Sequence, residues 1–99
     1  MNLFDIPEKN FAKEIVDILG KSDNVRIERI LSSGHTTDWY DQEQEEFVIL
    51  LSGEAVLEFE NGDKLKLCKG DNLVIKAHEK HRVVYTSSEP VCVWLCVFY

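Results

Sequence analysis

Apolar and polar residues alternate along most of this chain, which is the pattern of half-buried β-strands. Short runs rich in valine, isoleucine and aromatic residues recur after residue 24, at the spacing of about 8 to 12 residues that is typical of all-β domains. The predicted strands cover residues 25–31, 46–52, 54–60, 64–67, 72–76, 81–86 and 91–98. Asn61-Gly62 separates two of these runs and is the strongest short hairpin signal, so we expect an antiparallel barrel or sandwich.

The segment before residue 20 has a different periodicity. Its apolar residues recur at helical spacing: Phe11, Ile15, Ile18 and Leu19. Asn10 can cap a helix at its start, and Gly20 can end it. The pattern therefore predicts one short amino-terminal α-helix over about residues 10–19.

The last predicted strand is apolar on both faces. One face carries Cys92, Trp94, Cys96 and Phe98, and the other carries Val91, Val93, Leu95, Val97 and Tyr99. A monomeric barrel needs to bury only one face of such a strand, so another element or a second subunit should cover the other. We therefore expect a homodimer.

Length and charge narrow the possible partners. A chain of 99 residues is one domain, 1–99, and its net charge of -7, without a basic patch, argues against a nucleic-acid partner. The longest apolar runs, 47–51 and 91–99, are shorter than the ~20 residues of a membrane span, so no membrane is expected as a partner. No basic segment followed by an apolar one opens the chain, and a cytoplasmic location is the expectation.

Two spacings of glycine and polar residues stand out. The first runs from Gly34 through five residues to Tyr40, then Gln42, three residues, Glu46, six residues and Gly53. The second runs from Gly70 through five residues to Lys76, then His78, His81 and Tyr85. Their spacing resembles the two sequence motifs of the cupins, over about residues 25–99. Both histidines of the first cupin motif are replaced here. The glutamate of the first motif is present as Glu46, and the histidine of the second motif is present as His81.

The resemblance implies an all-β fold, the cupin or jelly-roll antiparallel β-barrel, preceded here by the short helix. It also implies a metal pocket whose ligand positions hold Tyr40, Gln42, Glu46 and His81. Parity supports this grouping, since residues two apart on a strand point to the same face. An amide and a phenol are weak ligands, so a divalent transition metal (Fe, Ni, Zn or Mn) should bind more weakly here than at three histidines and a glutamate.

Several further residues could line such a pocket. Parity places Tyr85 in one inward row with His81, and we expect His78 and Trp39 near the mouth. His35 and His78 lie in polar loop stretches, where exposure is the simpler expectation, although either could supply a second imidazole.

Two classes of function remain open. One is a small cupin whose barrel holds a metal-capable or small-molecule-binding pocket; if this pocket is catalytic, the resemblance implies a metal-dependent dioxygenase, isomerase or decarboxylase. The other is a metal-free module that has lost enzymatic activity and binds a small molecule or serves as a dimerising scaffold. In either class, except for a pure scaffold, the expected partner is a small-molecule substrate or ligand inside the barrel.

Overall fold

A computed structural model describes residues 1–7 and 10–99 and contains eight β-strands. Their bounds are β1 (Ile15–Lys21), β2 (Arg26–Ser32), β3 (Glu46–Ser52), β4 (Ala55–Phe59), β5 (Lys64–Leu67), β6 (Asn72–Ile75), β7 (His81–Thr86) and β8 (Cys92–Phe98). All strands predicted after residue 24 are present, and each observed end lies within one residue of the predicted end. Among the described residues, no helix is long and apolar enough to cross a membrane.

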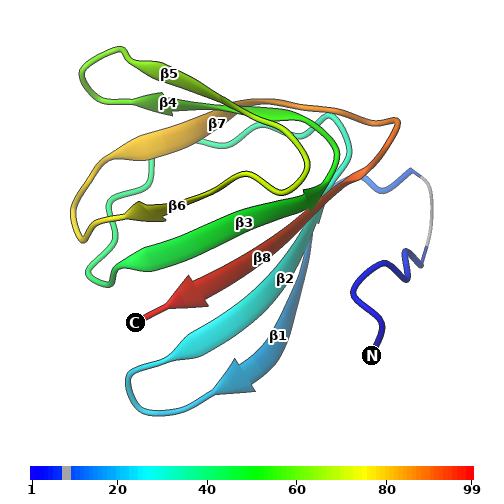
Figure 1. Ribbon diagram of the computed structural model, residues 1–99, viewed down its shortest axis with the longest axis horizontal. Helices are drawn as coiled ribbons and strands as arrows, with labels where there is room; N and C mark the ends of the chain where they lie inside the picture. The colour runs from blue at the N-terminus through cyan, green and yellow to red at the C-terminus, as the bar shows by residue number, and fades with distance from the viewer. Residues whose placement is uncertain (8–9) are drawn as a thin grey trace.

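The strands form two antiparallel sheets that face each other (Figure 1). The larger sheet has the order β1-β2-β8-β3-β6, and the smaller one has the order β5-β4-β7. The strand that is apolar on both faces, β8, lies in the middle of the larger sheet and pairs with β2 and β3. This confirms the all-β antiparallel fold predicted from the sequence.

The amino-terminal helix predicted over residues 10–19 is wrong. Residues 15–21 instead form β1, which pairs antiparallel with β2 along its whole length. Three residues of this segment are β-branched: Ile15, Val16 and Ile18. Such residues favour a strand, and the backbone hydrogen bonds to β2 outweigh the weak helical spacing. Gly20 does not end a helix but follows a shift in the β1–β2 register.

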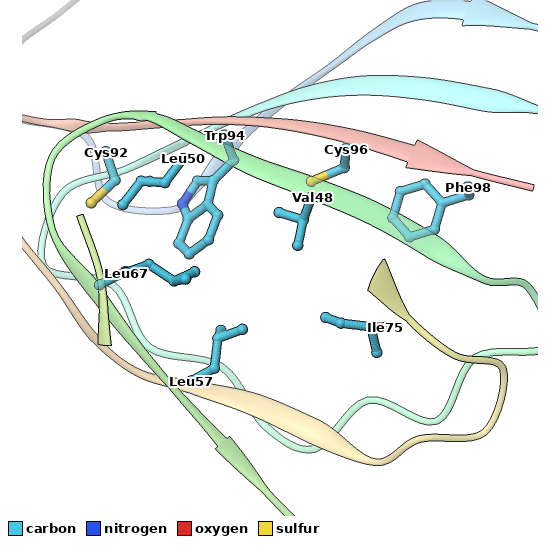
Figure 2. Packing of buried hydrophobic residues seen from close by; sticks show 10 residues of the cluster. Val48, Leu50, Leu57, Leu67, Ile75, Cys92, Trp94, Cys96 and Phe98 are labelled. Atoms are coloured by element: carbon cyan, nitrogen blue, oxygen red, sulfur yellow. The ribbon is translucent and has the colours of Figure 1, made fainter. Parts of the chain in front are cut away.

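The core lies between the two sheets. Figure 2 shows Trp94, Cys96 and Phe98 of β8 pointing toward Leu57 of β4 and Ile75 of β6. These side chains are at most 7% exposed. The inward parity predicted for the even positions of β8 is therefore confirmed.

The amino-terminal segment is tied to the outer face of the larger sheet by Arg29 of β2. The Arg29 guanidinium pairs with Asp17 on β1, at 2.6 Å between Nη2 and Oδ2. It also donates to the backbone carbonyls of Asn2, Leu3 and Asp5. Because Arg29 is 3% exposed, these partners are needed to satisfy a buried charge.

Candidate functional site

A cavity of about 640 Å³ lies inside the barrel. Most of its wall is apolar and comes from both sheets: Ile30, Val48, Leu57, Ile75, Val83, Trp94 and Phe98. The apolar wall continues the core, because β2, β3 and β8 present alternate side chains to the interior. The volume lies within the range of sites that hold drug-sized molecules.

The structure brings together the four residues that the sequence motifs singled out. Tyr40, Gln42, Glu46 and His81 all line this cavity. Glu46 begins β3 and His81 begins β7, while Tyr40 joins the edge of β7 through an isolated bridge to His81. The backbone N–H of Tyr40 donates to the His81 carbonyl at 2.7 Å, and that of His81 donates to the Tyr40 carbonyl at 3.2 Å. Two strand beginnings and one loop thus converge at the polar part of the cavity.

Glu46 and His81 form a buried pair. His81 Nε2 lies 3.8 Å from Glu46 Oε1, and the two side chains are 5% and 9% exposed, respectively. The other ring nitrogen, Nδ1, lies 2.9 Å from the Glu79 carbonyl oxygen. Because a carbonyl can only accept, Nδ1 carries a proton, and Nε2 is the nitrogen that faces Glu46. This arrangement can hold a proton for exchange with a bound molecule.

Burial shifts the pKa values of the acids in this cluster upward. Burial raises the pKa of Glu46 above its usual value, while the Cys96 thiol, His81 and the Gln42 amide act in the opposite direction. Burial and then the carboxylates of Glu14 and Glu46 raise the pKa of Tyr40. The pKa of Cys96 also rises far above its usual value, chiefly through burial. Tyr40 and Cys96 therefore remain neutral at physiological pH.

One donor in the cavity is unsatisfied. Gln42 Nε2 is fully buried and makes no hydrogen bond of ordinary length with a described residue, although the Gln42 amide is close enough to Glu46 to lower the pKa of that carboxyl. A buried donor without a partner costs free energy unless a bound molecule or water accepts from it. Gln42 therefore offers a bound molecule a place to attach an acceptor.

Tyr85 is not among the residues that line the cavity, although parity placed it there. In the pairing of β4 with β7, Leu57 lies opposite Val83 and Val56 lies opposite Tyr85, so Val84 is an extra residue. This β-bulge reverses the side-chain alternation after Val83. Tyr85 consequently points away from the cavity and is 48% exposed.

Trp39 and the two remaining histidines also lie outside the cavity lining. Trp39 is 46% exposed, and the Arg82 guanidinium lies over its ring at 4.5 Å.

His78 is exposed and its Nδ1 lies 2.7 Å from Asp41 Oδ1. His35 stacks on Phe11 at 5.3 Å between ring centroids and so helps to hold the amino-terminal segment. Neither histidine adds a second imidazole to Glu46 and His81.

Sequence reasoning missed the charged residues of the cavity wall. Glu14, Arg26 and Glu28 line the cavity but were not singled out. The alternation in the strand over residues 25–31 could have placed Glu28 on the inward face with Ile30. Glu14 could not be found in this way, because the spacing of the apolar residues around it predicts a helix and not a strand.

The residues present do not fit a tightly held transition metal. Among residues 1–7 and 10–99, no group of three or more histidine, cysteine, aspartate and glutamate side chains is placed to hold a metal ion. Glu46 and His81 supply two good donors, and the neighbouring amide and phenol are poor ones. A site of this composition would leave most coordination positions to water.

A family model and several solved structures place the chain among known proteins. The family model described as Cupin domain matches residues 27–98. The search of curated proteins found no match.

Three solved structures are similar to this chain over most of its length. A candidate mannose-6-phosphate isomerase from Ralstonia eutropha JMP134 is 35% identical, with a TM-score of 0.93 over 99% of this chain and 94% of that chain. A cupin superfamily protein from Desulfitobacterium hafniense DCB-2 is 23% identical, with a TM-score of 0.79 over 92% and 81% of the two chains. An RmlC-like cupin from Desulfovibrio desulfuricans is 17% identical, with a TM-score of 0.77 over 99% and 92%.

The last two similarities concern the fold, whereas the first joins fold and sequence over nearly the full length of both chains. Because the family model also spans residues 27–98, the chain belongs to the cupin family.

Proposed function

We propose that this cupin binds a small organic molecule with an apolar body inside the barrel, and that Glu46 and His81 contact its polar group. The observation that carries the proposal is a buried carboxyl–imidazole pair that opens onto an apolar cavity of about 640 Å³. Apolar walls with a few convergent polar groups are the usual form of a small-molecule site.

The polar groups of the cavity have complementary roles. Gln42 Nε2 supplies a donor without a partner, and His81 Nε2 supplies a nitrogen that is not engaged by the Glu79 carbonyl. Glu46 can accept or, when protonated, donate. A hydroxyl or amino group on the bound molecule would satisfy these atoms better than an empty cavity does. The proposal concerns binding and requires no reaction. If the protein also catalyses acid–base chemistry of the isomerase type, the Glu46–His81 pair could supply both the acid and the base.

A divalent transition metal is the second candidate ligand. The geometry of His81 favours it, because metal-bound histidines usually donate their other N–H to a carbonyl or carboxylate, as His81 Nδ1 does to Glu79. The shortage of donors argues against tight binding. We therefore place the metal below the organic ligand and expect no stoichiometric metal on protein purified without chelators.

The test is an NMR titration of the protein with a series of phenylalkanols, from benzyl alcohol to 4-phenylbutan-1-ol. The indole N–H of Trp94 reports on the cavity, and that of Trp39 is an internal control because it lies outside the cavity lining. We expect the Trp94 signal to move and the Trp39 signal to stay. Parallel titrations with Zn²⁺ and Ni²⁺, followed by melting temperature, test the metal.

Filling the cavity provides the matched variant. Val83→Phe projects a larger side chain into the cavity and should weaken phenylalkanol binding about tenfold or more. Val74→Phe adds the same group at a position that is 46% exposed and not among the lining residues, so binding should be unchanged. An unmoved Trp94 signal across the whole series would refute the proposal. Stoichiometric metal with a large gain in melting temperature would favour the second candidate instead.

A further inference from the structure

The charged side chains of the cavity wall are mostly acidic. Glu14, Glu28 and Glu43 line it in addition to Glu46. Among the described lining residues, Arg26 is the only arginine or lysine. The cavity wall therefore carries an excess of negative charge, and the apolar side chains around it screen this charge less than water would.

Arg26 does not offset the negative charge of Glu14 and Glu43, because it already pairs with Glu28. Its Nε lies 2.7 Å from Glu28 Oε2, so the two charges neutralise each other. The Arg26 guanidinium also lies over the Phe98 ring, 4.4 Å from the ring centroid. An anionic group entering the cavity would have to compete with both contacts. The contact with Phe98 also shows that an aromatic face of this wall accepts a cation.

Glu14 is held at the wall by a chain of hydrogen bonds. The Trp94 indole N–H donates to Ser32 Oγ at 3.1 Å, and the Ser32 hydroxyl donates to Glu14 Oε2. The Glu14 carboxylate lies close enough to the interior to raise the pKa values of Tyr40 and Cys96. It forms no ion pair with any described residue.

Glu43 adds a second negative charge to the cavity wall. It lies in the polar loop between β2 and β3, it is exposed, and it also lacks an ion pair among the described residues. Glu14 and Glu43, two carboxylates without an ion pair among the described residues, thus border a space that is walled by Tyr40, Trp94 and Phe98. Carboxylates beside aromatic faces form an environment suited to an organic cation.

We propose that the barrel cavity selects small organic cations, an ammonium or similar group on an apolar body, over neutral and anionic molecules of the same shape. Glu14 and Glu43 attract the cationic group, and the aromatic walls contact it and the apolar body. The inference rests on the proposed function and adds the charge of the ligand to it. A phosphorylated or carboxylated ligand would face the same carboxylates, and among the described lining residues the one guanidinium, that of Arg26, is already paired with Glu28.

The experiment compares three probes that differ only in their charged or polar end: 3-phenylpropan-1-amine, 3-phenylpropan-1-ol and 3-phenylpropanoate. Affinities are measured at pH 7 from the Trp94 indole signal, at low and high salt. We expect the amine to bind about tenfold more tightly than the alcohol, and the carboxylate to bind most weakly. The preference should shrink as salt is added, because the mouth of the cavity is accessible to ions.

Isosteric variants locate the effect. Glu14→Gln retains an acceptor for the Ser32 hydroxyl and removes the charge, so it should reduce the preference for the amine to about threefold or less. Glu43→Gln should act in the same direction. Glu60→Gln removes the same charge from an exposed residue that lies outside the cavity lining and pairs with Lys80, and it should leave the preference unchanged.

The possible outcomes separate the two proposals. If none of the three probes moves the Trp94 signal, the proposed function fails and this inference fails with it. If the alcohol binds but the carboxylate equals or exceeds the amine, the proposed function stands and only the charge selection is overturned. If Glu60→Gln weakens the preference as much as Glu14→Gln does, the effect arises from net charge, and the local cation site is refuted.

Discussion

Glu46 is a carboxylic acid whose side chain is only 9% exposed. The His81 imidazole lies 3.8 Å away, beyond hydrogen-bonding distance, and burial raises the pKa of Glu46 more than the Cys96 thiol and His81 lower it. Protonation therefore relieves a cost of burying the charged form. The native state accordingly prefers the protonated acid more strongly than the unfolded chain does.

This preference sets a pH dependence of stability. In the unfolded chain Glu46 titrates near its usual value of 4.5, whereas in the native state it titrates at a higher pH. Between these two values the native state binds more protons than the unfolded state, so stability falls as pH rises through this interval. We predict that Glu46→Gln, which cannot ionise, gains stability relative to the native chain as pH increases from 4 to 8. Melting temperatures across this range measure the difference.

The controls isolate Glu46 from other titrating groups. Glu60→Gln changes an exposed carboxylate, and its melting temperature should differ from that of the native chain by the same small amount at every pH. Repeating the comparison in a His81→Gln background removes the facing imidazole. If the melting temperatures of Glu46→Gln and the native chain differ by a constant amount from pH 4 to 8, the Glu46 carboxyl titrates in the native state as it does in the unfolded chain, and the prediction is wrong.

At the scale of elements, the turn between β3 and β4 depends on Gly53. Its φ of +90° lies in the region that residues with a Cβ rarely adopt. A Cβ built there would lie 2.7 Å from Cys92 Sγ and 2.9 Å from Cys92 Cα on β8. The turn is therefore constrained both by backbone conformation and by close packing against the neighbouring strand.

We predict that Gly53→Ala destabilises the fold by about 3 kcal/mol or more, because backbone strain and a steric clash add. Gly62→Ala is the matched control. Gly62 has a nearly identical φ of +92°, but nothing lies within 4 Å of the position its Cβ would occupy. It should cost only the conformational term, about 1–2 kcal/mol. Urea unfolding of both variants tests this, and equal losses would contradict a packing role for Gly53.

The strands after residue 24 could be predicted from local alternation, and the meeting of Tyr40, Gln42, Glu46 and His81 from the resemblance of their spacing to the cupin motifs. Tyr85 could not, since the extra residue Val84 in β7 leaves no mark in the sequence and reverses the parity that follows it. The strand β1 was missed for a related reason. Its pairing with β2 is a long-range interaction, and a short segment with both helical spacing and β-branched residues does not decide between the two.

At the scale of the whole molecule, the outer face of the larger sheet is apolar along β3 and β8, although it does not face the core; the Arg29–Asp17 pair lies on its β1–β2 part. Glu46 and Val48 point inward from β3, so the residues between and after them point outward, and so do the alternate residues of β8. The half-buried outward residues include Phe47, Ile49, Leu95 and Val97. An apolar face of this kind is typical of surfaces that bind another protein.

We predict that two copies associate through this face, with an observed mass of about twice 11.4 kDa in light scattering after size exclusion. Phe47→Lys and Val97→Lys each place a charge on the outer face, where the two residues lie opposite each other in the β3–β8 pairing, and each should shift the population toward the monomer. Leu65→Lys on β5 of the smaller sheet adds the same charge at a position that is 39% exposed and should leave the mass unchanged. Circular dichroism confirms that each variant is folded before its mass is interpreted. A native chain that elutes as a monomer of 11.4 kDa at high micromolar concentration would refute the interface, and would leave the apolar outer face for a partner other than a second copy.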